Sequence, residues 1–271
     1  MAISPRPQVE LEKTYNAAAD HYDHPPVSFW DRFGRRTVDR LPLISGMAVL
    51  DVCCGMGASA IPAAERVGPA GKVIAVDLAE KLLSKGSQRA TEQGLTNIEF
   101  CRADLESLPF PDRTFDAVLC VFGIFFVTDL QGAIRELWRL VRPNGLLAIT
   151  IWGRGLFEPA DGIFWEAVRR EDPELYGSIK PWSKIFEPDP LRALLLECGV
   201  SNPEAVAEAG WNPLRAPEDW WTIVLGTGYR STVDALSPLN RERVRTASID
   251  GVRRADIRQI RTDVVCAVAR R

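Results

Sequence analysis

Histidine and methionine are scarce in this chain, and long hydrophobic runs are missing. The 271 residues include two histidines and three methionines, so acid–base chemistry by histidine is limited to His21 and His24. The six cysteines are scattered without the spacing of metal ligands, and they predict reduced thiols and no metal site. Neither an internal repeat nor a low-complexity tract is present, which argues against repeat architectures.

Charge and hydrophobicity narrow the class of protein further. The net charge of −3 gives no indication of binding to nucleic acid or to an anionic membrane. No apolar run reaches the roughly 18 residues that span a bilayer, and residues 1–13 lack the apolar region of a secretory signal. These features predict a cytoplasmic protein without membrane insertion that acts on a small-molecule substrate.

The chain is organised around the segment 48–59, which reads AVLDVCCGMGAS. Its apolar residues bracket Asp51 and predict a buried parallel strand, which runs into a loop containing Gly55 and Gly57. The small residues that follow open a helix. Because glycines let the backbone approach a ligand closely, this strand, turn and helix N-terminus predict a cofactor site.

Two cofactor patterns overlap on this segment. Read as GxGxxA from Gly55, with Asp77 about 20 residues further on, it matches the dinucleotide fingerprint. Read as DxCxGxG from Asp51, it resembles motif I of the class I S-adenosylmethionine-dependent methyltransferases. The second pattern also explains the acidic residue directly before the turn. Cys53 departs from this motif, because glycine usually holds that place.

Strands and helices alternate from residue 48 to residue 152, which predicts a parallel, doubly wound sheet. Ligands bind such sheets at the carboxyl ends of the strands. Asp51, Asp77, Asp104 and Phe122 all fall at strand ends, so we expect them to converge on one edge. There Asp77 can accept hydrogen bonds from both ribose hydroxyls of an adenosine. The alternative is that Asp77 caps the helix expected over 79–93.

The segment 108–116, LPFPDRTFD, carries the clearest family resemblance. It is similar to the stretch between the third and fourth strands of the type-11 methyltransferase family, which includes the ubiquinone and menaquinone methyltransferases. That resemblance implies that Asp104 accepts a hydrogen bond from an adenine amino group and that the Leu105 amide lies near the ring. Without the resemblance, an aspartate after a strand is more often a turn residue.

The first 43 residues predict a helical lid. Helical spacing is present over 9–22 and 29–41, and two prolines break the chain between them. Tyr15 and Tyr22 resemble the lead-in of many small-molecule methyltransferases, in which this segment closes over the cofactor. The alternative is ordinary helix packing by two tyrosines.

Phe125 and Phe126 stand where relatives in this family often carry a pair of histidines. The mouth of the site is therefore expected to be apolar and aromatic. With that pair absent, His21 and His24 in the lid are the remaining histidine candidates for a general base.

Beyond Trp152 the pattern changes to short helical pieces rich in tryptophan. We expect residues 153–271 to form a helical substrate cap interleaved with two last strands, near 205–211 and 263–268. A cap of this composition suits a hydrophobic, planar substrate, although tryptophan also builds ordinary cores. The substrate-pocket candidates are Phe125, Phe126, Trp182, Trp220 and Trp221.

Taken together, residues 44–152 are expected to form a Rossmann-like α/β core that binds S-adenosylmethionine. Its seven-stranded sheet should be mostly parallel, with an antiparallel last strand. The expected function is methylation of a small, apolar or aromatic metabolite of the natural-product tailoring type. The alternatives are a quinone-pathway C-methyltransferase, a non-catalytic protein that binds the same cofactor and, more remotely, an NAD-dependent oxidoreductase. The expected cofactor-binding residues are Tyr15, Tyr22, Asp51, Cys53, Gly55, Gly57, Asp77, Leu78, Asp104, Leu105 and Phe122.

Overall fold

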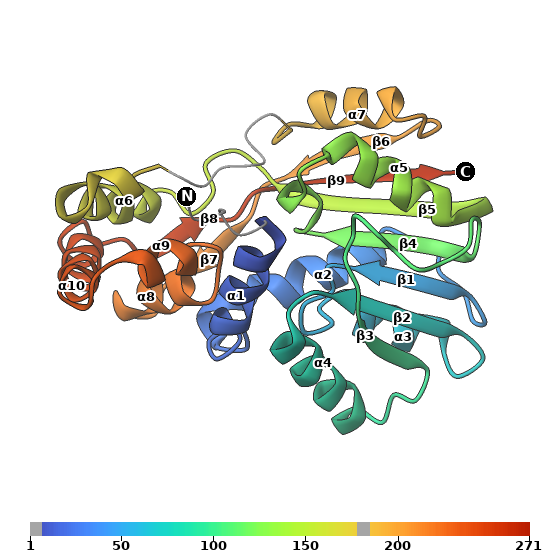
Figure 1. Ribbon diagram of the computed structural model, residues 1–271, viewed down its shortest axis with the longest axis horizontal. Coiled ribbons are helices and arrows are strands. Elements are labelled where there is room, and N and C mark those ends of the chain that lie inside the picture. Colours follow the sequence, from blue (N-terminus) through green and yellow to red (C-terminus); the bar gives the residue numbers. More distant parts are fainter. Residues whose placement is uncertain (1–6, 178–184) are drawn as a thin grey trace, which may run out of the picture.

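A seven-stranded sheet forms the centre of the computed structural model, which describes residues 7–177 and 185–271 (Figure 1). The strand order is β3-β2-β1-β4-β5-β9-β6. Strands β1 to β5 run parallel, and β9 is antiparallel to both of its neighbours. The predicted doubly wound sheet with an antiparallel last strand is therefore confirmed. The strands are β1 (Ala48–Val52), β2 (Lys72–Asp77), β3 (Ile98–Arg102), β4 (Phe115–Val121), β5 (Val141–Trp152), β6 (Glu204–Glu208) and β9 (Val264–Arg270).

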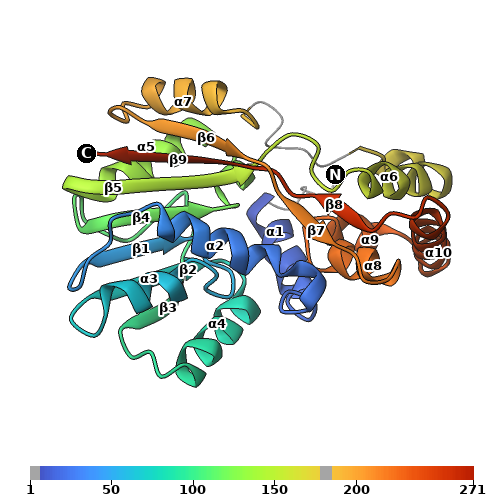
Figure 2. The same ribbon diagram turned by 180° about the vertical axis from the view of Figure 1, so that it is seen from behind.

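Helices cover both faces of this sheet. Helices α2 and α3 lie on one face and α5 lies on the other, while α7 packs beside β6 and β9 (Figures 1 and 2). Every residue of β4 is buried, as expected for a central strand with helices on both sides. The helices of this part are α2 (Phe29–Asp39), α3 (Ala60–Val67), α4 (Glu80–Glu92), α5 (Leu130–Leu140) and α7 (Pro188–Glu197).

A helical cap lies at the end of the sheet where the parallel strands terminate (Figure 1). Helix α1 contacts both α4 of the core and α9 of the cap, so the N-terminal segment bridges the two parts. The remaining elements are α1 (Pro7–Ala18), η1 (Pro25–Val27), η2 (Ile124–Phe126), α6 (Ala160–Glu171), η3 (Pro173–Leu175), β7 (Trp211–Pro213), α8 (Glu218–Leu225), α9 (Arg230–Ala235), α10 (Pro238–Arg254) and β8 (Gln259–Arg261).

The last strands differ from expectation in one respect. The single strand expected over 205–211 is divided, because β6 ends at Glu208 and Trp211 begins β7. Strand β7 pairs with β8 through Trp211 and Arg261, directly beyond the pairing of Glu208 with Val264. This second, two-stranded sheet extends from the core into the cap. Its two strands follow β6 and precede β9 in the chain, so the antiparallel pairing of these segments continues from the core into the cap.

Within residues 7–177 and 185–271, no helix combines the length and the apolar composition needed to cross a bilayer.

Candidate active site

The turn after β1 has an unusual backbone. Cys53, Gly55 and Gly57 all have positive φ values, of 58°, 53° and 81°, a region that glycine enters at little cost. A Cβ atom on Gly55 would also lie 3.3 Å from the hydroxyl oxygen of Tyr22. Glycine at this position therefore lets the lid segment come close to the turn. Cys53 holds the same backbone conformation without being glycine, and its side chain lies at the cavity described next.

A cavity lies at the carboxyl ends of β1, β2 and β4, with about 750 Å³ of empty space, part of it open to solvent. We call it the first cavity. Helix α1 contributes Leu11, Glu12 and Tyr15 to its wall, so the N-terminal segment forms part of this cavity. The residues proposed from sequence that line it are Tyr15, Tyr22, Cys53, Asp77, Leu78, Asp104, Leu105, Phe122 and Phe126.

Asp77 lies at the end of β2 and is fixed by two backbone donors. Its Oδ2 accepts a hydrogen bond from the Gly55 amide at 2.9 Å, and its Oδ1 accepts one from the Ala79 amide at 2.9 Å. Burial raises the pKa of this carboxyl. Because a carboxylate has about four acceptor positions, Asp77 retains capacity for hydroxyl donors from a ligand.

The lining of the first cavity is acidic. Glu12, Asp77, Asp104 and Glu106 contribute carboxyl groups, and among the described residues no lysine, arginine or histidine lines it. The Asp104 carboxylate is oriented by the Glu106 amide, which donates to its Oδ1 at 3.0 Å. Apolar side chains such as Leu105 lie between these acidic groups. Such a cavity favours a cationic ligand and gives phosphate groups no positively charged partner.

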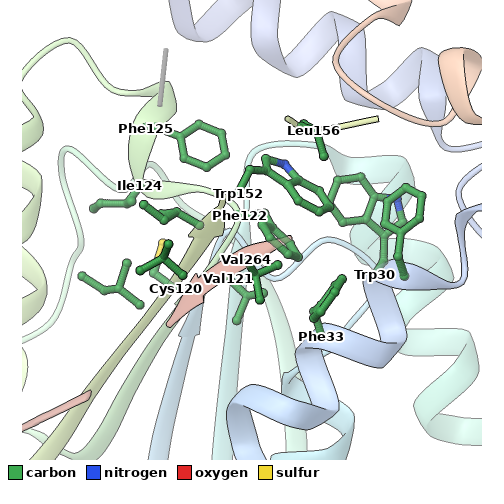
Figure 3. Packing of buried hydrophobic residues seen from close by; sticks show 14 of the residues in the cluster. Trp30, Phe33, Cys120, Val121, Phe122, Ile124, Phe125, Trp152, Leu156 and Val264 are labelled. Atoms are coloured by element: carbon green, nitrogen blue, oxygen red, sulfur yellow. The ribbon is translucent and has the colours of Figure 1, made fainter. Parts of the chain in front are cut away.

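A second cavity, of about 350 Å³, adjoins the first. The described part of its wall is apolar or aromatic except for three hydroxyl-bearing residues: Tyr15, Thr227 and Tyr229. The ring of Trp152 stacks on Phe122, with ring centroids 3.9 Å apart, and Figure 3 shows both beside Trp30 and Phe33 of α2. The residues that line it are Tyr15, Trp30, Phe126, Trp152, Leu156, Phe157, Thr227, Gly228 and Tyr229.

Several of these lining residues were not proposed from sequence. Trp152 ends β5, so the rule that ligands meet strand ends could have identified it. Trp30 lies on a helix face with many apolar neighbours, and nothing in its spacing separates it from a core residue. Tyr229 and Gly228 come from a cap loop, whose position follows only from the tertiary structure.

Asp51 is placed below the turn and not in the cavity wall. Its side chain is fully buried, and its Oδ2 accepts a 2.8 Å hydrogen bond from the Ser59 hydroxyl. Burial raises the pKa of this carboxyl to about 7. Gly55 and Gly57 also lie outside both cavity walls; they shape the turn and the approach of Tyr22. Asp51 thus supports the turn from beneath.

The two histidines lie together, away from both cavities. Their ring centroids are 5.3 Å apart, and neither residue lines the first or the second cavity. Burial, followed by the neighbouring His24, lowers the pKa of His21. The turn that contains both histidines lies close to the end of α8. A Cβ atom on Gly226, the residue directly after α8, would lie 3.2 Å from the His21 carbonyl oxygen.

The aromatic residues proposed for the substrate pocket divide into two groups. Phe126 lines both cavities, whereas Phe125 is buried behind it. Trp220 and Trp221 are buried in the interior of the cap and line neither cavity, because α8 presents them to the hydrophobic core. Trp182 lies outside the described residues.

The fold and the cavity at the strand ends define a Rossmann-like protein of the class I methyltransferase type. Residues 12–158 match the model of the ubiE/COQ5 methyltransferase family, and the chain belongs to that family. The match extends from within α1 to just beyond β5, so it includes every described residue that lines the first cavity except Leu11.

Individual relatives agree with this assignment. The chain is 35% identical over 141 residues to the aklanonic acid methyltransferase DauC of Streptomyces sp. (strain C5), an alignment that covers 52% of this chain and 64% of the relative. It is 38% identical over 143 residues to a demethylmenaquinone methyltransferase of Listeria monocytogenes, covering 51% and 60%. The chain therefore spans less than two thirds of the length of these relatives.

The fold has counterparts among solved structures. The YcgJ protein of Bacillus subtilis superposes with a TM-score of 0.58 at 18% sequence identity, covering 89% of this chain and 98% of that one. At this identity the likeness concerns the fold alone.

Proposed function

We propose that this chain transfers a methyl group from S-adenosylmethionine to a small, apolar or aromatic metabolite, in the manner of a natural-product tailoring enzyme. The acidic wall of the first cavity carries this proposal. S-adenosylmethionine bears a sulfonium and an amino group, both positively charged. Four carboxyl groups line the cavity, and of these Glu12 is already paired with Arg102, which is not among the lining residues. NAD would instead place two phosphates in a cavity whose described wall has no basic side chain, which opposes the dinucleotide interpretation of the glycine turn.

The lining residues fit an adenosine group. Asp77 and Asp104 both line the first cavity; in this proposal Asp77 accepts hydrogen bonds from ribose hydroxyls and Asp104 accepts one from an adenine amino group, with Leu105 and Leu78 in apolar contact with the nucleoside. When bound, S-adenosylmethionine supplies a methyl group on a positively charged sulfur. Tyr22, which approaches the turn at Gly55, would exclude water from this side of the site.

The second cavity is the proposed acceptor site. Its wall is built from aromatic rings and aliphatic side chains, which suits a planar, apolar ring system. Transfer of a methyl group from sulfonium requires mainly alignment of the reactants and exclusion of water. An aromatic enclosure meets both needs for an acceptor that binds as its anion, such as a phenolate that has already released its proton to solvent. A quinone-pathway C-methyltransferase is the second candidate, favoured by the similarity to a demethylmenaquinone methyltransferase.

Calorimetric titration with S-adenosylmethionine, S-adenosylhomocysteine and NAD, run side by side, tests the cofactor. The expected result is micromolar affinity for the two sulfur nucleotides and none for NAD. Binding of NAD alone would overturn the proposal, because the glycine turn would then be a dinucleotide site.

Transfer of radiolabelled methyl groups to a panel of planar phenols tests the reaction. Naphthols and hydroxyanthraquinones represent tailoring acceptors, and naphthohydroquinones represent the quinone pathway. A Gly228→Leu variant serves as a control, since a side chain at this position points toward the Tyr15 hydroxyl, 3.8 Å from the place of the Cβ, and fills the second cavity. It should lose transfer, and because Tyr15 also lines the first cavity, its affinity for S-adenosylhomocysteine is measured alongside to show that the cofactor still binds. Cofactor binding without transfer to any acceptor would favour a non-catalytic role.

A further inference from the structure

The two cavities share three lining residues, and all three are aromatic. Tyr15, Trp30 and Phe126 line both the first and the second cavity. They come from three separate elements: α1, α2 and η2. With a methyl donor in the first cavity and an acceptor in the second, the methyl group is exchanged across this shared boundary. These three side chains therefore form the immediate surroundings of the transferred methyl group.

The rings are held in place by further aromatic contacts. Tyr15 and Phe126 meet edge to face, with ring centroids 5.7 Å apart. The ring of Trp30 stacks on Tyr22 at 5.0 Å, with the two planes 4° apart. Phe125 contacts Phe126 from behind at 4.7 Å. Because each shared ring is fixed by a neighbour, the boundary between the cavities is preformed.

None of the three side chains offers a negative charge at neutral pH. Burial raises the pKa of the Tyr15 phenol, so it remains uncharged. The carboxyl groups of the first cavity, such as Asp77 and Asp104, do not line the second. A cation at the boundary thus meets aromatic side chains, and an aromatic ring attracts positive charge over its face through the ring quadrupole, most strongly where water is excluded.

We propose that Tyr15, Trp30 and Phe126 form an aromatic collar that recognises the positive charge of the sulfonium and its methyl group. The collar rests on the proposed function and deepens it by naming residues that discriminate the charged methyl donor from its neutral product. S-adenosylmethionine gains the cation–aromatic attraction, whereas S-adenosylhomocysteine, a neutral thioether at the same sulfur, does not. After transfer the product, S-adenosylhomocysteine, has lost this charge, so the collar binds it more weakly.

The chain contains a matched control for this proposal. Phe125 and Phe126 are adjacent phenylalanines in η2, but Phe125 lines neither cavity and Phe126 lines both. Substitution of either by leucine removes an aromatic ring and preserves an apolar side chain. Only the change at Phe126 removes a ring from the boundary. Tyr15→Leu provides a second variant, on the half-buried lid helix and outside the central core.

The experiment is calorimetric titration of wild type, Phe126→Leu, Tyr15→Leu and Phe125→Leu with S-adenosylmethionine and with S-adenosylhomocysteine. Sinefungin carries an ammonium group in place of the sulfonium, so it tests the effect of the positive charge in a ligand that lacks the S-methyl group. Phe126→Leu and Tyr15→Leu should weaken binding of S-adenosylmethionine and sinefungin by about fivefold to tenfold, with S-adenosylhomocysteine changed less than about twofold. Phe125→Leu should leave the ratio of the three affinities as in wild type.

Equal losses for all three ligands in both boundary variants would overturn the collar and leave these rings with a packing role only. The collar is likewise overturned if Phe125→Leu shifts the ratio as strongly as Phe126→Leu does. A wild-type protein that binds neither sulfur nucleotide would instead overturn the proposed function itself. The ratio of affinities within one variant is insensitive to the fraction of folded protein, so moderate destabilisation does not obscure the result.

Discussion

The hydroxyl group of Tyr229 donates a 2.5 Å hydrogen bond to Oδ1 of Asp161, and each residue is only 5% exposed. Asp161 lies in the first turn of α6, and Tyr229 directly precedes α9. Burial and this neighbouring carboxyl raise the pKa of Tyr229, so the tyrosine stays a donor. The bond fixes the loop of the cap that contributes Gly228 and Tyr229 to the second cavity.

Tyr229→Phe should lower the free energy of unfolding by about 1.5–3 kcal/mol, the value of a hydrogen bond to a charged group. Its affinity for S-adenosylhomocysteine should not change, because Tyr229 does not line the first cavity. Urea denaturation and calorimetry measure the two quantities. Tyr176→Phe, at a tyrosine that is 52% exposed, is the control. A Tyr229→Phe variant as stable as the control would show that the bond contributes nothing.

Asp51 gives the stability of the protein a pH dependence. Burial raises its pKa to about 7 in the folded state, against about 3.9 for an unfolded chain. The folded state therefore holds the proton of Asp51 more tightly, so the contribution of this one carboxyl to stability is greatest below pH ~4 and is lost as the pH rises through 7, by about 4 kcal/mol in total. Asp51→Asn removes this titration, and its unfolding free energy relative to wild type should rise between pH 4 and pH 8.

Urea denaturation across that range checks the Asp51 prediction. Loss of the carboxylate acceptor for Ser59 adds an offset that does not depend on pH, so only the slope is diagnostic. Asp189→Asn, at a side chain that is 89% exposed, is the surface control measured under the same conditions. A flat difference for Asp51→Asn would contradict the raised pKa.

Gly34 is a point of backbone contact between α2 and the glycine turn. A Cβ on Gly34 would lie 2.3 Å from the carbonyl oxygen of Ala58 and 2.8 Å from the amide nitrogen of Ser59. Because these are backbone atoms, α2 must move for alanine to fit. Gly34→Ala should lower the unfolding free energy by about 1–3 kcal/mol despite the better helix propensity of alanine, and weaken cofactor affinity by displacing the turn.

Gly162→Ala is the matched control for Gly34→Ala. Gly162 is also within a helix, α6, and no atom lies within 4 Å of the place of its Cβ. That variant should be unchanged or more stable by up to about 1 kcal/mol. Thermal denaturation of both variants separates the gain in helix propensity from the cost of the steric clash at Ala58. Equal behaviour of the two would mean that the contact at Ala58 relaxes without cost.

The sheet and the first cavity followed from the sequence because their signals are local. Buried strands are apolar runs, and ligands meet parallel strands at their carboxyl ends, so the strand-end rule selects Asp77, Asp104 and Phe122, which line the first cavity. The same rule also selects Asp51, which lies beneath the turn instead, and the role of Asp104 depends on the family resemblance as well. The cap gave no such signal. Trp220 and Trp221 were proposed as pocket residues from their composition, yet tryptophan fills a helical core as readily as a pocket, and the structure buries both in the cap.

The second cavity depends on contacts between segments that are far apart in the chain. Trp30 and Tyr229 meet there from α2 and from the loop before α9, and no spacing rule relates the two. The division of the expected strand into β6 and β7 has the same origin, since it depends on pairing with β8 and β9. Turn residues such as Cys53 are a separate case, because a positive φ outside glycine is not evident from sequence.

Asp77 has two possible roles, and its contacts support both. Its Oδ1 accepts the amide of Ala79 two residues on, as a turn-forming aspartate does, while the side chain also lines the first cavity. If Asp77 binds the ribose, Asp77→Ala should weaken the binding of S-adenosylhomocysteine about tenfold to a hundredfold, because charge-assisted hydrogen bonds are lost. Asp23→Ala, which removes an exposed partner of Lys85, should not.

A double-mutant cycle separates the two roles of Asp77. Affinities of wild type and Asp77→Ala are measured for S-adenosylhomocysteine and for its 2′-deoxy analogue. If Asp77 accepts from the ribose, removal of the hydroxyl costs affinity in wild type and little in the variant, so the two changes couple. If Asp77 only organises the turn, both proteins lose the same factor, because the variant then weakens each ligand through the displaced Gly55 amide. Additive losses would therefore assign the carboxylate to the turn and leave the ribose without its proposed acceptor.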